Sequence, residues 1–145
     1  MFDIKMQLAF LIECTISHVS LFELSDGRFQ ILESGRIGPF LSGPGYLLVE
    51  NELASFLQGL QLERLIYESA ILFERSTGTE YRTHTRIRVG QFFKPDQIND
   101  LALSGPRLLT MGDEHYFVSE YLKLLLEDSD FNYLSFSEGL GRFAG

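Results

Sequence analysis

Cysteine is nearly absent from this sequence, which has Cys14 alone among 145 residues. A single thiol cannot close an intramolecular disulfide, and it cannot supply the thiolates of a cysteine-based zinc site. Histidine is also scarce, and none of His18, His84 and His115 is followed by a ligand-type residue two, three or four positions later. Since metal-binding motifs depend on such spacings, we expect neither a metal ion nor another cofactor.

Long hydrophobic runs are missing as well. The apolar run at 8–12 has five residues and is bounded by Lys5 and Glu13. A membrane-spanning helix needs about 20 apolar residues, and a secretory signal needs a longer apolar region followed by small residues. Together with the lone thiol, this pattern predicts a cytoplasmic protein with no membrane partner.

Positive charge is the minority charge, because 12 Lys and Arg stand against 20 Asp and Glu, for a net charge of −8. Nucleic-acid binding depends on clustered cations, so nucleic acid is not an expected partner. The sequence also lacks Gly-x-Ser-x-Gly and Gly-x-x-x-x-Gly-Lys-Ser/Thr, the nucleophile and phosphate-loop motifs of two large enzyme classes. We therefore expect a non-catalytic protein with no catalytic residues.

Apolar residues are plentiful, at 45% of the chain with 13 Phe and 6 Tyr, which excludes a disordered chain. The length predicts a single α+β domain over residues 1–145. Residues 1–43 are expected to form an N-terminal β region. In it, β-prone segments at 20–24 and 28–32 flank Asp26-Gly27, which is typical of a tight hairpin.

Two strand–helix–strand units are expected after that region, the first at 46–89 and the second at 113–138. Apolar spacing predicts helices at 50–59 and 119–127, with strands at 46–49, 62–73, 81–89, 116–118 and 131–136. A shift of 69 residues lays 48–70 over 117–139 with apolar residues matched, for example Leu53 with Leu122. This match fits an internal duplication, and it fits equally two unrelated units with a common apolar pattern. We expect both units to share one mixed sheet with the N-terminal hairpin.

Arginine is concentrated on one of these strands. In 81–89 the alternation places Arg82, Arg86 and Arg88 on one face together with His84. Arginine is a frequent interface anchor, so the three arginines are candidate partner-binding residues. They are expected to meet either acidic helices of the same chain or an acidic stripe on a partner.

Acidic residues gather near the C-terminal end. Residues 113–145 hold seven acidic side chains against Lys123 and Arg142. Several lie at the end of the predicted helix at 119–127, where the helix dipole disfavours negative charge. The charge predicts either a solvated surface or a partner site, and the candidate binding residues are Asp113, Glu114, Glu127, Asp128, Asp130 and Glu138. A third interpretation makes Asp113, Glu114 and His115 an acid–base site of an enzyme.

Two segments carry a recurring phrase in which a short apolar strand leads into a helix, followed by a strand with an aromatic residue. The clearer copy is VSEYLKLLL at 118–126 followed by FNYLSF at 131–136, and the looser copy starts at Val49. This phrase resembles bacterial polymorphic-toxin immunity proteins of the double-CXXCG group and its relatives without cysteines. The present sequence has no CXXCG pair, so zinc binding is not carried over.

The resemblance implies a cytoplasmic immunity protein of bacterial competition. Such a protein binds a cognate toxin of a contact-dependent or secreted antibacterial system and occludes its active site. An acidic inhibitor suits a cationic toxin, because opposite charge raises the association rate. The alternative function is a non-catalytic scaffold that forms a homodimer through surplus apolar surface.

Overall fold

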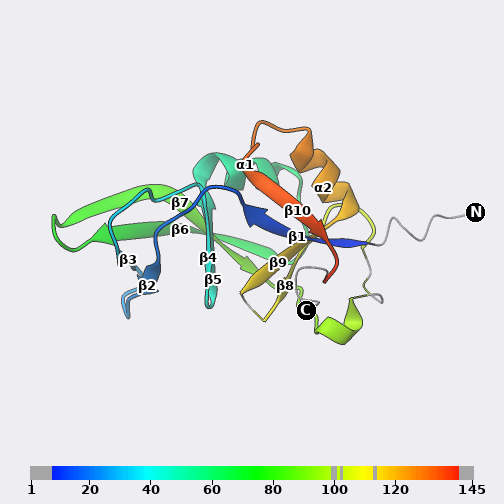
Figure 1. The fold of residues 1–145 in the computed structure, drawn as a ribbon, viewed down its shortest axis with the longest axis horizontal. Helices are drawn as coiled ribbons and strands as arrows, with labels where there is room; N and C mark the ends of the chain where they lie inside the picture. Colours follow the sequence, from blue (N-terminus) through cyan, green and yellow to red (C-terminus); the bar gives the residue numbers. More distant parts are fainter. Residues whose placement is uncertain (1–7, 99–100, 102, 113, 141–145) are drawn as a thin grey trace, which may run out of the picture.

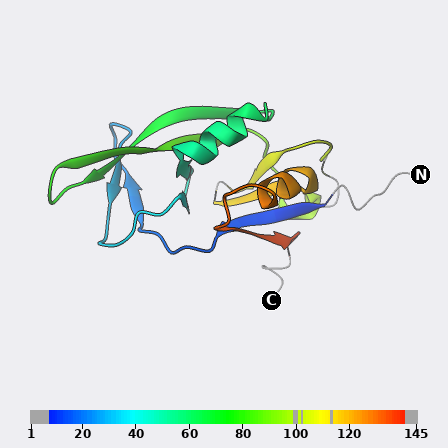
Figure 2. The ribbon, with the colours of Figure 1, turned by 90° about the horizontal axis from the view of Figure 1, so that it is seen from above.

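The computed structural model describes residues 8–98, 101, 103–112 and 114–140. These residues contain two α-helices and ten strands, and the strands form two sheets (Figure 1). The α+β class expected from the sequence is confirmed. The two sheets lie toward opposite ends of the long axis of the molecule in both Figure 1 and Figure 2. No helix among these residues is long and apolar enough to span a membrane.

The small sheet has four antiparallel strands in the order β10-β1-β9-β8. Its bounds are β10 (Leu134–Glu138), β1 (Ala9–Cys14), β9 (His115–Ser119) and β8 (Leu108–Met111). The central strand β1 comes from the N-terminal region, with Leu11 opposite both Phe117 and Ser137. Both ends of the described chain therefore build this sheet.

The large sheet has six strands in the order β2-β3-β6-β7-β5-β4 and is curled into a half-barrel. Its bounds are β2 (Leu21–Glu23), β3 (Phe29–Ile31), β6 (Leu65–Glu74), β7 (Thr79–Val89), β5 (Tyr46–Glu50) and β4 (Phe40–Gly43). It is a mixed sheet because β3 runs parallel to β6 whereas all other pairs are antiparallel. The expected hairpin is present as β2 and β3, and Gly27 in its turn has the positive φ of +92° that glycine tolerates best.

The expectation of a single shared sheet is wrong. β1 does not join the hairpin formed by β2 and β3 but inserts between β9 and β10. The N-terminal β region at 1–43 is therefore divided between the two sheets. Local sequence predicts that a segment is extended, but strand pairing is decided by residues far away in the chain.

The two strand–helix–strand segments correspond closely in position. β5 and β9 begin 69 residues apart, as do α1 (Asn51–Gly59) and α2 (Glu120–Glu127), and β6 and β10. In the large sheet β7 lies between β5 and β6, and in the small sheet β1 lies between β9 and β10. The registers also agree: Val49 faces Thr85 and Leu65 faces Val89, while Val118 faces Phe10 and Leu134 faces Cys14.

The main core joins these two arrangements. It contains side chains of both helices and both sheets, including the pairs Val49 and Val118, Leu53 and Leu122, and Leu57 and Leu126. Two further clusters lie on either side of it, one around Leu72 in the large sheet and one around Leu109 in the small sheet. The small sheet is thus covered on both faces, and β1 is central to it.

Candidate functional site

The acidic residues of the second unit are distributed over three places. Asp128 and Asp130 are exposed just beyond α2, and Glu127 in its last turn pairs with Lys123 at 3.0 Å. Glu138 is exposed at the end of β10, and Glu114 is exposed in the turn before β9. Asp113 lies outside the described residues. Since β9 and β10 run in the same direction, Glu114 and the loop from α2 lie at one end of the sheet and Glu138 at the other.

A groove lined by both apolar and polar side chains adjoins the acidic end of α2. It has a volume of about 380 Å³ and lies between the last turn of α2, the following loop and β10. Its apolar walls are Leu126, Phe131, Leu134 and Phe136, and its polar rim is Glu127, Asn132 and Ser135. Residues of one continuous segment, 126–136, therefore line this groove, and the exposed Asp128 and Asp130 belong to the same segment.

The candidate arginines on β7 all have acidic partners in the same chain. Arg82 pairs with Glu80 at 3.3 Å and Arg88 with Glu68 at 2.7 Å, and both arginines are exposed. Arg86 is buried, with its guanidinium 2.7 Å from Glu23 and donating to the Gly45 carbonyl at 2.9 Å. Of the two expected environments, these side chains occupy the intramolecular one, although their acidic partners lie on strands rather than helices.

The suggested acid–base group is only partly described. Glu114 is exposed in a turn, whereas the His115 side chain is half-buried in the first position of β9. Asp113, the third member, is outside the described residues. Within the described ranges no three His, Cys, Asp or Glu side chains are placed to hold a metal ion together.

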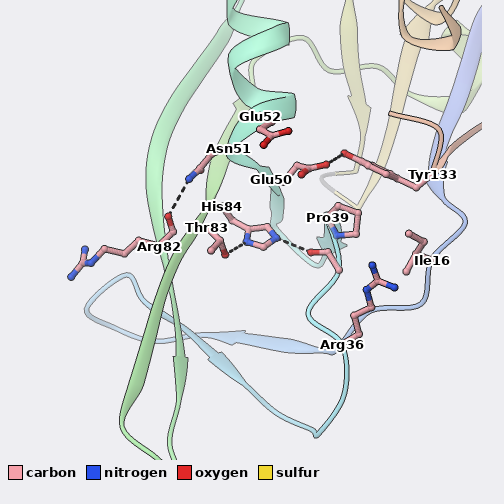
Figure 3. A pocket seen from close by; sticks show the side chains of 11 residues that line it. Ile16, Arg36, Pro39, Glu50, Asn51, Glu52, Arg82, Thr83, His84 and Tyr133 are labelled. Carbon is pink, nitrogen blue, oxygen red and sulfur yellow. Dashed lines mark hydrogen bonds between the residues drawn. The ribbon is translucent and has the colours of Figure 1, made fainter. Parts of the chain in front are cut away.

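A polar cavity of about 580 Å³ lies elsewhere, at the junction of five segments (Figure 3). Its position could not be predicted from the sequence, because the five segments that line it are far apart in the chain. Its lining residues are Ile16, Arg36, Gly38, Pro39, Glu50, Asn51, Glu52, Arg82, Thr83, His84 and Tyr133. No local sequence signal indicates this cavity, since the burial of His84 is visible only in the folded chain.

His84 forms part of the wall of this cavity. Its Nε2 is 2.8 Å from the Gly38 carbonyl and its Nδ1 is 2.8 Å from the Thr83 hydroxyl. Since the carbonyl can only accept, Nε2 carries the proton, and Nδ1 accepts from the hydroxyl in the neutral ring. Burial lowers the pKa of His84, because it disfavours the charged imidazolium.

Glu50 and Tyr133 connect the two sheets across the same cavity. The Tyr133 hydroxyl donates to the Glu50 carboxylate, and Figure 3 shows the two side chains pointing toward each other. Burial, and then the hydrogen bond to Glu50, raise the pKa of Tyr133. The Asn51 amide is also occupied, by the Arg82 carbonyl and the Thr85 hydroxyl. Most polar groups of the cavity thus hold the fold together.

Comparison of the chain with protein-family models, with curated proteins and with solved structures gave no match. Function must therefore be inferred from the charges, cavities and sheet edges of the chain itself. Two surfaces are candidates, the groove beside α2 and the polar cavity around His84. The groove combines apolar side chains with the exposed acids of the adjoining loop, a combination found at protein-binding surfaces, whereas the cavity carries both signs and is largely satisfied internally.

Proposed function

We propose that this protein is a cytoplasmic immunity protein, which binds a cationic toxin of bacterial competition and occludes its active site without catalysing a reaction. The observation that carries this proposal is the unpaired negative charge of the loop that follows α2, next to the groove. Asp128 and Asp130 are exposed there and have no ion-pair partner among the described residues. A surface that concentrates unpaired negative charge favours encounter with a cationic protein.

Two further observations support a binding role. The groove floor offers apolar side chains of the kind that are enriched in interface centres, including Phe131 and Phe136. The phrase at 118–136 that resembles immunity proteins contributes α2 and the groove itself. The resemblance and the charge therefore point to the same surface.

Growth rescue tests the proposal. The probe is the product of the open reading frame adjacent to this gene, expressed in a bacterial host with and without the present protein. We expect the neighbouring product to arrest growth alone and the pair to restore it. Arrest that the present protein does not relieve, or turnover of a substrate by the purified protein, would contradict the proposal.

The charge argument has its own test in a pair of double variants. The double variant Asp128→Asn with Asp130→Asn is expected to bind the toxin identified by growth rescue about tenfold more weakly at low salt. The salt dependence of this binding should also decrease. The matched control, Asp26→Asn with Glu80→Gln, removes the same charge from the hairpins at the opposite end of the molecule (Figures 1 and 2). Equal affinities for the two variants would exclude this surface.

A homodimeric scaffold is the second candidate, and one observation favours it. Tyr121 and Leu124 lie one turn apart on α2 and are 51% and 50% exposed. An apolar pair on an outer helix face is typical of a subunit interface. Sedimentation at micromolar concentration distinguishes the candidates, because a scaffold predicts a dimer that Leu124→Glu dissociates, whereas the immunity proposal needs no dimer.

We also propose that the two arrangements around α1 and α2 descend from one duplicated unit. The support is the common 69-residue spacing of three successive elements and the agreement of the strand registers. Chance would have to reproduce the element order, the spacing and the pairing together. Exchange at a matched position where the two helices differ is the experiment: Phe56→Leu combined with Leu125→Phe should keep cooperative unfolding if the units are related.

A further inference from the structure

We infer that β10 is a docking strand, to which the cationic partner adds an extended segment of its own as a fifth strand of the small sheet. This inference rests on the proposed binding function and specifies how the partner is held. The structural reason is that β10 is an edge strand with a groove beside it, and that the exposed Asp128 and Asp130 lie in the loop that leads into the strand. Addition of a strand to an open sheet edge is a common mode of peptide recognition.

The backbone of β10 has its hydrogen-bonding groups arranged for such an addition. Tyr133 and Gly139 bond to β1, through Thr15 N–H to the Tyr133 carbonyl at 2.7 Å and Gly139 N–H to the Ala9 carbonyl at 2.8 Å. In an antiparallel ladder, alternate residues bond to the same neighbour, so Ser135 and Ser137 also face β1. Phe136 and Glu138 consequently direct their N–H and C=O groups away from β1, toward the open edge.

The opposite edge of the same sheet is already covered. The Thr110 N–H in β8 donates to the Gln91 carbonyl at 3.0 Å, and the Thr110 carbonyl accepts from Phe93 N–H at 3.1 Å. The segment at 91–93 therefore occupies the outer side of β8. No described segment pairs in this way with the outer side of β10.

The first half of β6 provides a natural comparison, because it corresponds to β10 in the other arrangement. Gly90 N–H donates to the Arg64 carbonyl, so by alternation Leu65, Tyr67 and Ser69 face away from β7. The acidic side chains near this edge form ion pairs, Glu63 with Arg107 and Glu68 with Arg88. The edge geometry is thus similar at β6 and β10, but unpaired acidic charge accompanies β10.

The groove determines which segment fits. Leu134 and Phe136 lie on one face of β10 and line the groove together with Leu126 and Phe131. An added strand has a period of two, so apolar side chains on one of its faces would enter the groove. Lysine or arginine near the end of that strand would meet Asp128 and Asp130. The partner segment is therefore extended, with alternating apolar residues and at least one cationic residue.

Amide hydrogen exchange on the full chain tests the inference. The probe is a synthetic eight-residue peptide of alternating lysine and leucine, compared with the same peptide N-methylated at every residue so that neither edge can donate. We expect the unmodified peptide to slow exchange of the Phe136 and Glu138 amides at least tenfold. The Ser135 and Ser137 amides should be protected with and without peptide, and the N-methylated peptide should have no effect. Protection confined to other elements, or equal effects of both peptides, would overturn the inference.

A pair of proline variants tests the same edge with the partner itself. Glu138→Pro removes an outward N–H, whereas Ser69→Pro removes the outward N–H at the corresponding position of β6; neither removes a bond to the neighbouring strand. We expect Glu138→Pro to abolish growth rescue and Ser69→Pro to retain it. Rescue by Glu138→Pro would overturn the docking strand but leave the proposed function intact, whereas failure of the wild-type protein to rescue would refute the function. If Glu138→Pro does not fold, the peptide pair still decides the outcome.

Discussion

His84 is the residue whose ionisation is most clearly connected to folding. It is buried, and its neutral ring bridges Thr83 and the Gly38 carbonyl. Because its pKa is lowered by burial, the unfolded chain binds a proton more readily than the folded chain as the pH falls through the ordinary histidine range. The contribution of His84 to stability is therefore complete at pH values above that range and decreases below it.

The first prediction follows from this sign. Lowering the pH from about 7.5 to 5.5 should reduce the free energy of unfolding of the wild-type protein, and His84→Gln should reduce that dependence. Urea unfolding at both pH values measures the difference. The wild-type protein measured under the same conditions is the reference for the variant at each pH. A His84→Gln variant with unchanged pH dependence would show that the buried ring does not cause it.

Tyr67 has a hydroxyl that is poorly matched to its environment. Its oxygen is buried with no hydrogen-bond partner among the described residues, and burial raises its pKa. The corresponding residue of the second arrangement, 69 positions later, is Phe136, which packs against the same core. An unsatisfied buried hydroxyl costs about 1–3 kcal/mol.

We therefore predict that Tyr67→Phe stabilises the protein by about 1 kcal/mol, since it removes the hydroxyl and keeps the ring. Thermal unfolding should then occur about 3 °C higher. Tyr81→Phe, at a half-buried position on β7, is the comparison variant and should have a smaller effect. A decrease in melting temperature for Tyr67→Phe would mean that the hydroxyl has a partner in solution.

At the scale of elements, the two helices begin differently. The Ser119 hydroxyl accepts from Leu122 N–H and Arg107 N–H and donates to the Gly105 carbonyl, so it caps α2 and holds the preceding loop. The corresponding residue before α1 is Glu50, whose side chain makes no capping bond and instead accepts from Tyr133. The same position in the two arrangements thus serves local capping in one and contact between the sheets in the other.

Ser119→Ala should destabilise the protein by about 2 kcal/mol, because it removes a helix cap and leaves buried backbone groups without partners. Urea unfolding is the measurement. Ser55→Ala, in the exposed middle of α1, is the matched control and should change stability by less than about 0.5 kcal/mol. A similar small effect at Ser119 would indicate that α2 does not depend on its cap.

For the whole molecule, the shared core should make unfolding cooperative. Leu53 on α1 and Leu122 on α2 are both fully buried in that core, where residues of both sheets meet. The central strand β1 also links the N-terminal region to the small sheet. Unfolding of either sheet would therefore expose apolar side chains of the other sheet to water.

Leu53→Ala and Leu122→Ala should therefore each reduce stability by about 3 kcal/mol. In both variants the native amide signals of Leu72, in the large sheet, and Leu109, in the small sheet, should disappear at one urea concentration. Leu124→Ala on the exposed side of α2 is the control and should cost less than about 1 kcal/mol. Separate transitions for the two amides would show two independently folding parts.

The sequence predicted individual elements well where the signal is local. The Asp26-Gly27 hairpin and both helices follow from turn chemistry and apolar spacing, and the helices lie within one residue of their predicted bounds. The strand predicted at 131–136 begins instead at Leu134, because residues 128–133 are held in turns by bonds such as Ser129 N–H to the Leu126 carbonyl. Aromatic residues in that loop pack on α1 through Phe56 and Phe131, so their apolar character does not indicate a strand.

What the sequence alone determined is the α+β class, both helices with the strands next to them, and the 69-residue spacing, because these depend on neighbours within a few residues or on a direct comparison of segments. The strands β1, β4 and β8 were not predicted. Only the tertiary structure decided that β1 completes the small sheet, that Arg86 and His84 are buried, and that the groove and the open edge of β10 lie side by side. The physical reason is that strand pairing and burial depend on contacts with distant residues, 83 positions apart in the bond between Tyr133 and Glu50 and 46 in the bond between His84 and the Gly38 carbonyl. No periodicity along the chain carries that information.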